Sequence, residues 1–100
     1  MARRVIPMTR GERDWAEWAI GGMPDYPEGR EEMYGRDVPD SEMPRIEGME
    51  LIVPADPEVL DDLLYRLEEQ ARDVAAGDAT EQVTAARMRP AQALAAKIRG

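Results

Sequence analysis

The sequence predicts a mainly α-helical protein: an N-terminal short helix, an extended Pro/Gly-rich acidic arm, a short β-strand and a C-terminal antiparallel helical hairpin. Three observations lead to this prediction. Residues 56–77 carry a helix cap, an apolar stripe and a stop signal, and residues 79–99 carry a second helical pattern directly behind them. Residues 21–50 concentrate proline, glycine and carboxylates, which interrupt regular structure. We therefore expect an irregular interaction arm with one short helix over 1–54 and a helical hairpin over 55–100.

The segment 56–77 has the most consistent helical signals in the chain. Asp56 is a favourable N-cap, because its carboxylate can accept amide protons of the first turn, and Pro57 suits the first helical position. Gly77 supplies a stop. The apolar residues between them recur at helical spacing and form one stripe: Val59, Leu60, Leu63, Leu64, Leu67, Ala71, Val74 and Ala75.

A second helix is predicted over residues 79–99, where Asp78 and Glu81 form a capping pattern. Pro90 lies inside this segment and lacks an amide proton, so we expect a kink or two short helices. The turn at Gly77 is short, which favours an antiparallel hairpin.

Charge supports this hairpin. Residues 55–82 hold nine acids and two bases, whereas residues 83–100 hold four bases and no acid. Folding back would bring Lys97 and Arg99 close to the first acids of the preceding helix, which are Asp56, Glu58, Asp61 and Asp62. Within that helix two acid–base pairs have the favourable spacing of four residues: Asp62 with Arg66 and Glu68 with Arg72.

The first 20 residues predict a strand and a helix. Residues 5–6 are Val-Ile and can form an edge strand that ends at the following proline. Thr9 and Glu12 match a capping box, which opens a helix over about 10–20, and a Gly-Gly pair ends it.

Residues 21–50 predict an arm that is mostly extended. They contain five glycines, four prolines and nine acids against three arginines, with at most one helical turn near residues 30–34. Such a segment gains too little from internal contacts to offset its ordering entropy, so we expect it to lie on a partner. Met49, Leu51 and Val53 then alternate as in a short strand, which could pair with residues 5–6.

The length and composition of the chain limit the size of its core and its expected location. One hundred residues make one domain at most, and with 17 Leu, Ile and Val, no Phe and a net charge of −8 the core is small. Oligomerisation or a partner is expected to add stability. Twelve Arg against one Lys, with 14 Ala and no Asn, indicates a GC-rich host. No apolar run reaches ten residues, which argues against a membrane-spanning helix and a secretory signal, so a cytoplasmic or virion-associated protein is expected.

No catalytic, cofactor-binding or metal site is predicted. The chain has neither His nor Cys, so the commonest general base, the thiolate nucleophile and thiolate metal ligands are missing. Ser41 is the only serine and lies in a proline-rich segment beside Asp40, which fits a turn. The adjacent acid pairs of residues 61–62 and 68–69 fit a solvated helix face better than a metal site.

Aromatic and methionine side chains are the candidates for partner binding. Trp15 and Trp18 share one face of the first helix and could either fill the protein's own core or anchor it in a partner. Methionines and tyrosines follow along the arm and could act as separate small anchors. The candidate partner-binding residues are Trp15, Trp18, Met23, Tyr26, Tyr34 and Met43.

These features predict a non-enzymatic, small acidic protein that binds another protein or itself. Direct nucleic-acid binding is disfavoured by the charge of −8, and membrane binding has no apolar segment to support it. The leading hypothesis is a structural or accessory subunit of a larger assembly, for example of a phage or mobile element. The alternative is an acidic regulatory inhibitor, such as an antitoxin, an anti-defence protein or a DNA mimic, that occludes a basic site.

Overall fold

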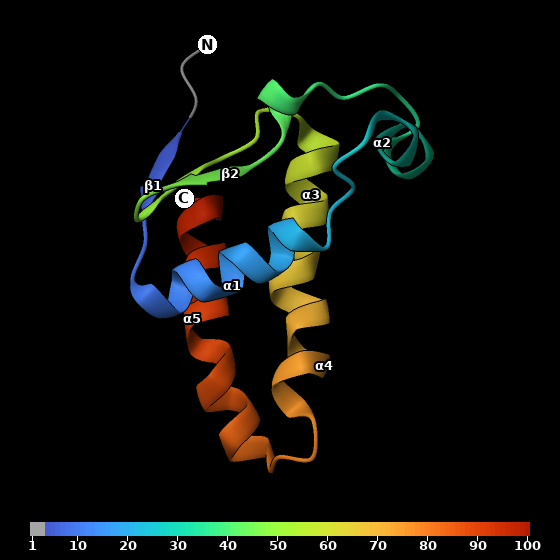
Figure 1. The fold of residues 1–100 in the computed structure, drawn as a ribbon. Helices are drawn as coiled ribbons and strands as arrows, with labels where there is room; N and C mark the ends of the chain where they lie inside the picture. Colours follow the sequence, from blue (N-terminus) through green and yellow to red (C-terminus); the bar gives the residue numbers. More distant parts are fainter. Residues whose placement is uncertain (1–3) are drawn as a thin grey trace.

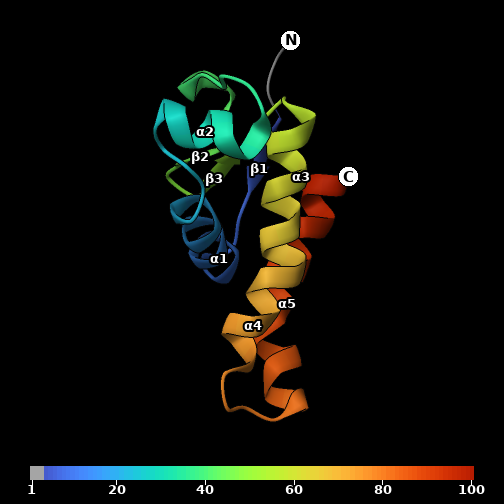
Figure 2. The ribbon, with the colours of Figure 1, turned by 90° about the vertical axis from the view of Figure 1, so that its right-hand side faces the viewer.

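The computed structural model describes residues 4–100 and has two layers. The C-terminal residues form an antiparallel helical hairpin, and the N-terminal residues form a small sheet and the helices α1 (Arg10–Gly21) and α2 (Pro27–Tyr34) (Figure 1). The N-terminal layer covers one face of one half of the hairpin, while the other half projects beyond it (Figure 2). The molecule is therefore elongated, with extents of 41, 27 and 21 Å. The prediction of a mainly α-helical fold is confirmed.

The first arm of the hairpin consists of α3 (Pro57–Tyr65), a π-helical turn η2 (Arg66–Gln70) and α4 (Ala71–Ala76), which follow one another without a break. Asp56 caps α3 as predicted, because its Oδ1 accepts the amide protons of Glu58 at 2.9 Å and Val59 at 3.1 Å. The helix ends before Gly77, also as predicted. The second arm, α5 (Glu81–Arg99), returns antiparallel and packs along η2 and α4.

The π-turn corrects the register of the apolar stripe. Five residues follow one another at a strict spacing of four, and all are buried: Val59, Leu63, Leu67, Ala71 and Ala75. In a regular α-helix each step of four turns the side chain by about 40°, so the five would spread over about 160°. The π-turn absorbs one extra residue between Leu67 and Ala71, which brings all five into an arc of about 80°. It also turns Val74 outward, so its predicted place on the stripe is wrong: its side chain is 55% exposed.

Helix α5 begins and continues differently from the expectation. Its N-cap is Thr80, whose Oγ1 accepts the amide proton of Val83 at 3.3 Å, rather than Asp78. The helix runs unbroken through Pro90, so the alternative of two short helices is wrong. Helix α1 lies across α5 at this point, and a Cβ on Gly11 would come within 3.1 Å of the Pro90 ring. The glycine that weakens the first turn of α1 thus allows the two helices to approach closely.

The sheet has three short antiparallel strands in the order β1-β3-β2. β1 (Val5–Pro7) pairs with β3 (Glu50–Ile52), with Ile6 opposite Leu51, so the predicted pairing of these segments is confirmed. The sequence did not predict β2 (Arg45–Glu47), which pairs with the other edge of β3. A tight turn joins β2 to β3 and contains Gly48 at φ +61°, a conformation that favours glycine.

Helix α1 (Arg10–Gly21) has the predicted capping box. The Thr9 Oγ1 accepts the amide proton of Glu12, and the Glu12 carboxylate accepts the amide proton of Thr9 at 2.7 Å. Glu12 is only 2% exposed and also accepts a hydrogen bond from Lys97 Nζ at 2.8 Å. Burial favours the neutral acid, but these hydrogen bonds outweigh it and lower the pKa of Glu12.

The prediction of an extended arm over residues 21–50 is confirmed only in part. The helical turn expected near residues 30–34 is the eight-residue helix α2 (Pro27–Tyr34), and the segment also contains the 3₁₀ turn η1 (Asp40–Glu42) and β2. Proline opens α2 at its first position, and Gly35 ends it at φ +73°. Arg30, 6% exposed, holds the flanking loops together: its guanidinium donates to the carbonyl oxygens of Pro24 at 3.1 Å and Val38 at 3.0 Å. Its bonds therefore supply a tertiary contact that the local pattern does not predict.

The charge pairs of the hairpin agree only in part with the predicted ones. Glu68 and, more weakly, the predicted neighbour Asp61 raise the pKa of Arg99. Arg99 bonds Glu68, with 3.1 Å between Nε and Oε2, so Glu68 reaches across to α5 instead of pairing with Arg72. Lys97 bonds Glu12 of α1, not an acid of α3. The first turns of α3 extend beyond the C-terminal end of α5 (Figure 1), which puts the predicted acids at Asp56 and Glu58 out of register with these cations. The Asp62–Arg66 pair is confirmed.

Two apolar clusters fill the interior. The larger joins residues of the sheet and α1, such as Leu51 and Ala16, with hairpin residues such as Leu63 and Leu94. The smaller lies between α4 and α5 and consists of Ala71, Ala75, Met88 and Ala91. Across residues 4–100, no helix is long and apolar enough to cross a membrane.

Candidate partner-binding surface

The two tryptophans stabilise the protein's own fold. Their rings meet edge to face, with centroids 5.3 Å apart and an interplanar angle of 89°. Both are partly buried and pack against both apolar clusters. Trp15 also donates its indole proton to the carbonyl oxygen of Arg87 at 3.1 Å. Of the two alternatives for Trp15 and Trp18, the structure supports packing in the protein's own core.

Three further candidates are buried because the predicted arm is folded. Met23, Tyr34 and Met43 are 6%, 6% and 7% exposed and belong to the larger apolar cluster. As side chains of an extended arm they were expected to be accessible to a partner. In this fold they contact the protein itself, so their predicted availability as exposed anchors is wrong.

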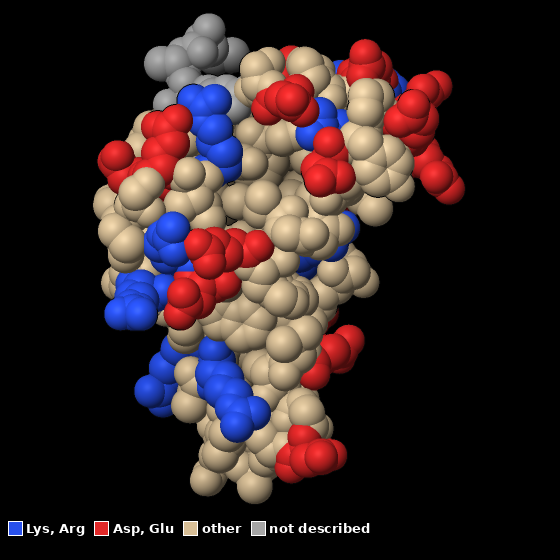
Figure 3. Space-filling model, in the orientation of Figure 1, with Lys and Arg blue, Asp and Glu red and all other residues tan. Residues whose placement is uncertain are grey.

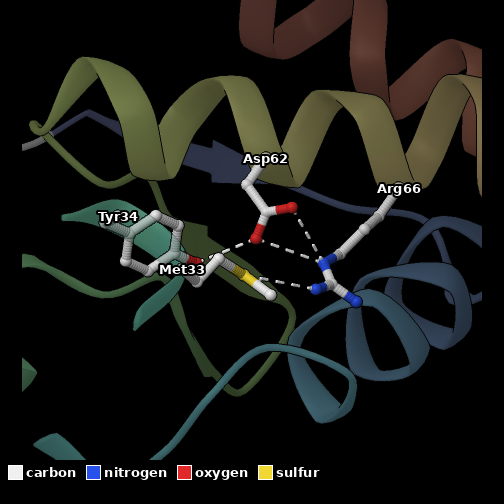
Figure 4. Close-up of polar contacts among 4 residues, drawn as sticks. All are labelled: Met33, Tyr34, Asp62 and Arg66. Atoms are coloured by element: carbon white, nitrogen blue, oxygen red, sulfur yellow. Dashed lines mark hydrogen bonds and ion pairs between the residues drawn. The ribbon is translucent and has the colours of Figure 1, made fainter. Parts of the chain in front are cut away.

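A polar cluster attaches α2 to α3 (Figure 4). Tyr34 donates its hydroxyl proton to Asp62 Oδ2 at 2.8 Å, and Arg66 Nε donates to the same carboxylate at 3.2 and 3.3 Å. Arg66 also reaches Met33, with 3.8 Å between Nη2 and Sδ. Burial and the neighbouring Asp62 carboxylate raise the pKa of Tyr34 well above its ordinary value, so the phenol remains neutral. These contacts hold α2 against α3.

The remaining candidate, Tyr26, lies on an exposed surface together with a residue that the sequence did not single out. Tyr26 and Met33 are 55% and 52% exposed. Both line a hollow of about 420 Å³ at the corner where α1 gives way to α2. We call its lining the corner surface: Gly22, Met23, Pro24, Asp25, Tyr26, Gly29, Glu32 and Met33.

Gly29 determines where the Tyr26 ring lies. A Cβ on Gly29 would come within 2.8 Å of Tyr26 Cζ, 2.9 Å of Cε2 and 3.0 Å of Pro24 Cβ. The ring therefore rests directly on the backbone of α2, beside the proline. A side chain at position 29 would displace it, so the glycine is a component of the site.

Acidic side chains surround the corner surface. Asp25 and Glu32 line the hollow, and Glu28 lies in the first turn of α2. The space-filling view shows acids gathered over α2, whereas the basic side chains lie mainly over α1 and α5 (Figure 3). A neighbouring hollow of about 330 Å³ shares Met23, Pro24 and Asp25 with the first and is also lined by Arg30 and Arg45. The corner surface thus combines apolar residues with the carboxylates of Asp25 and Glu32.

Part of the corner surface could have been predicted from the helical spacing of its residues in the sequence. Proline at position 27 and glycine at 35 frame an eight-residue helix, on which Gly29, Glu32 and Met33 fall three to four residues apart and thus on one face. Among residues 4–100, no group of three acidic side chains lies close enough to hold a metal ion. The chemistry present here is recognition by an aromatic ring, a thioether and carboxylates.

Comparison of the chain with protein-family models, with curated proteins and with solved structures found no match. Function is therefore inferred from the chain's own surfaces. Among the six candidates from the sequence, Tyr26 is the large, mostly exposed side chain that also lines a hollow.

Proposed function

We propose that this protein is a non-enzymatic, protein-binding subunit, a structural or accessory component of a larger assembly such as that of a phage or mobile element. It would act in the cytoplasm or on the virion. The observation that carries this proposal is the exposure of Tyr26 and Met33 beside one hollow, on a helix that internal contacts hold in place.

The energetics of recognition support a protein partner. Tyrosine is among the residues that dominate binding energy at protein interfaces, and methionine adapts its shape to the surface it meets. Arg30 and the Tyr34–Asp62 hydrogen bond fix α2 before binding, so little ordering entropy would be lost at Tyr26 and Met33.

A second function, that of an acidic inhibitor, is supported by the acids gathered over α2 (Figure 3). An antitoxin, an anti-defence protein or a DNA mimic would present these carboxylates to a basic site and occlude it. The two functions make different predictions. Binding by an inhibitor would weaken strongly with salt, whereas a subunit would enter a large particle at a fixed stoichiometry.

Site-specific photo-crosslinking in the native source tests the proposed function. A benzophenone amino acid at position 26 should capture one protein in high yield, and the same group at Tyr65, which is 54% exposed on α3, should not. Tyr26→Ala with Met33→Ala should remove the interaction while the far-ultraviolet circular dichroism stays unchanged. Equal capture from positions 26 and 65, or an interaction that survives the double substitution, would contradict the proposal.

A further inference from the structure

The hollow of the corner surface contains more than apolar groups. We infer that it binds an arginine or lysine side chain presented by the partner protein, with the alkyl stem on Met33 and the cation between the Tyr26 ring and Glu32. This inference rests on the proposed function and specifies the chemistry of its partner. Two independent features of the corner surface support it: an aromatic platform and a pair of carboxylates.

The aromatic platform is Tyr26. Its ring lies against Gly29, with Pro24 beside the same glycine, and more than half of the residue remains exposed. A cation over the free face of such a ring is attracted by its quadrupole. Because Gly29 and Pro24 fix the ring, the platform exists before the cation arrives.

The negative charge comes from Asp25 and Glu32, and no Lys or Arg is among the residues that line the hollow. Arg66 lies at one edge of the hollow, with its Nη1 2.7 Å from the place that a Cβ on Gly22 would take and its Nη2 3.8 Å from Met33 Sδ. Its side chain is only 12% exposed, and its ion pair is with Asp62. Among residues 4–100, no cation forms an ion pair with Glu32.

The size of the hollow limits what enters it. A volume of about 420 Å³ is near the lower end of the range for small-molecule sites. It suits one long side chain with its adjoining backbone, rather than an extended peptide. The sign of the surrounding surface then favours a partner segment with further basic residues.

Titration of the ¹⁵N-labelled full-length protein with amino-acid amides tests the inference directly. The probes are N-acetyl-arginine methylamide, N-acetyl-lysine methylamide and the uncharged N-acetyl-norleucine methylamide. We expect the cationic probes to saturate shifts of amides 22–33 with a dissociation constant on the order of 10 mM, and norleucine to bind at least about fivefold more weakly. Norleucine binding as tightly as the cations would overturn the inference, as would cation shifts that never saturate or spread over all acidic surfaces.

Matched variants locate the effect. Glu32→Gln removes the charge without changing shape and should weaken the cationic probes about threefold or more, whereas Glu31→Gln, an exposed acid on the same helix outside the hollow lining, should not. Gly29→Ala should displace the ring and weaken binding similarly, although alanine favours helix and the fold is retained. Equal effects of the two glutamine variants would contradict the inference.

The crosslinked complex separates this inference from the proposed function. If crosslinking at position 26 captures a protein and Glu32→Gln reduces its binding, both hold. If the capture persists unchanged in Glu32→Gln, while Tyr26→Ala with Met33→Ala removes the interaction, the protein-binding function stands and the basic side chain is refuted. If the arginine probe binds but no protein is captured, the cation site stands and the proposed function fails.

Discussion

Deletion of one residue from the π-turn should leave the hairpin folded. Gln70 is exposed and lies at the end of η2. Without it, a regular α-helix places Val59, Leu63 and Leu67 and the two following core alanines in the same arc of about 80° that the π-turn now provides. The loss of Gln70 therefore removes the extra residue and no core contact. We expect the free energy of unfolding to change by at most about 1 kcal/mol.

The matched control is deletion of Asp61, which is exposed on the regular part of the same helix. Every residue before the deletion then takes the angular position of its successor, so Glu58 occupies the place of the fully buried Val59. The loss of one buried valine and the approach of a carboxylate to the core should cost about 2–4 kcal/mol.

Urea denaturation followed by circular dichroism at 222 nm measures both changes, and backbone chemical shifts report whether the π-turn has become α-helical in the Gln70 deletion. A loss of 2 kcal/mol or more in that variant, comparable with the Asp61 deletion, would refute the idea that the π-turn only absorbs a surplus residue. It would indicate instead that the hairpin requires the π-turn geometry itself.

Three further outcomes are expected. Glu12→Gln should make stability less dependent on pH in the acid range. The pKa of Glu12 in the folded protein is below its ordinary value of 4.5, so its contribution to the free energy of unfolding is complete above pH 4.5 and is lost as the pH falls through the folded pKa. Denaturation between pH 3 and 7 measures this difference. Tyr34→Phe should lower stability by about 0.5–1.5 kcal/mol, whereas Tyr65→Phe, at an exposed position, should not. Leu94→Ala, at 0% exposure, should cost about 2–5 kcal/mol in the same assay.

Much of the helical framework could be predicted because its signals are local. The caps at Thr9 and Asp56 act within three residues of themselves, and the stop at Gly77 needs only its own backbone. The full length of α2 could not be predicted, for the opposite reason. Its hydrophobic pattern is weak, and its position depends on Arg30 bonding carbonyl groups six and eight residues away, a tertiary contact that no periodicity contains.

The π-turn illustrates an intermediate case. The spacing of four between the buried residues of this helix is present in the sequence, but a regular helical wheel contains no π-turn and places Val74 among them. For the candidate site, aromatic identity is sufficient to indicate Tyr26. Exposure cannot be predicted from the sequence, because it depends on which face of α2 meets α3, and that contact buries Tyr34 and leaves Met33 exposed.

The position of the tryptophan pair makes the protein its own spectroscopic reporter. Trp15 and Trp18 are its only tryptophans, and both lie where α1 contacts the two apolar clusters. Their fluorescence therefore monitors the docking of α1 on both clusters, the smaller one between α4 and α5 included. If the turn of the hairpin around Gly77 frays before α1 leaves the clusters, ellipticity will decrease at lower temperature than the emission maximum shifts, and the interval between the two curves will measure how independently the turn unfolds.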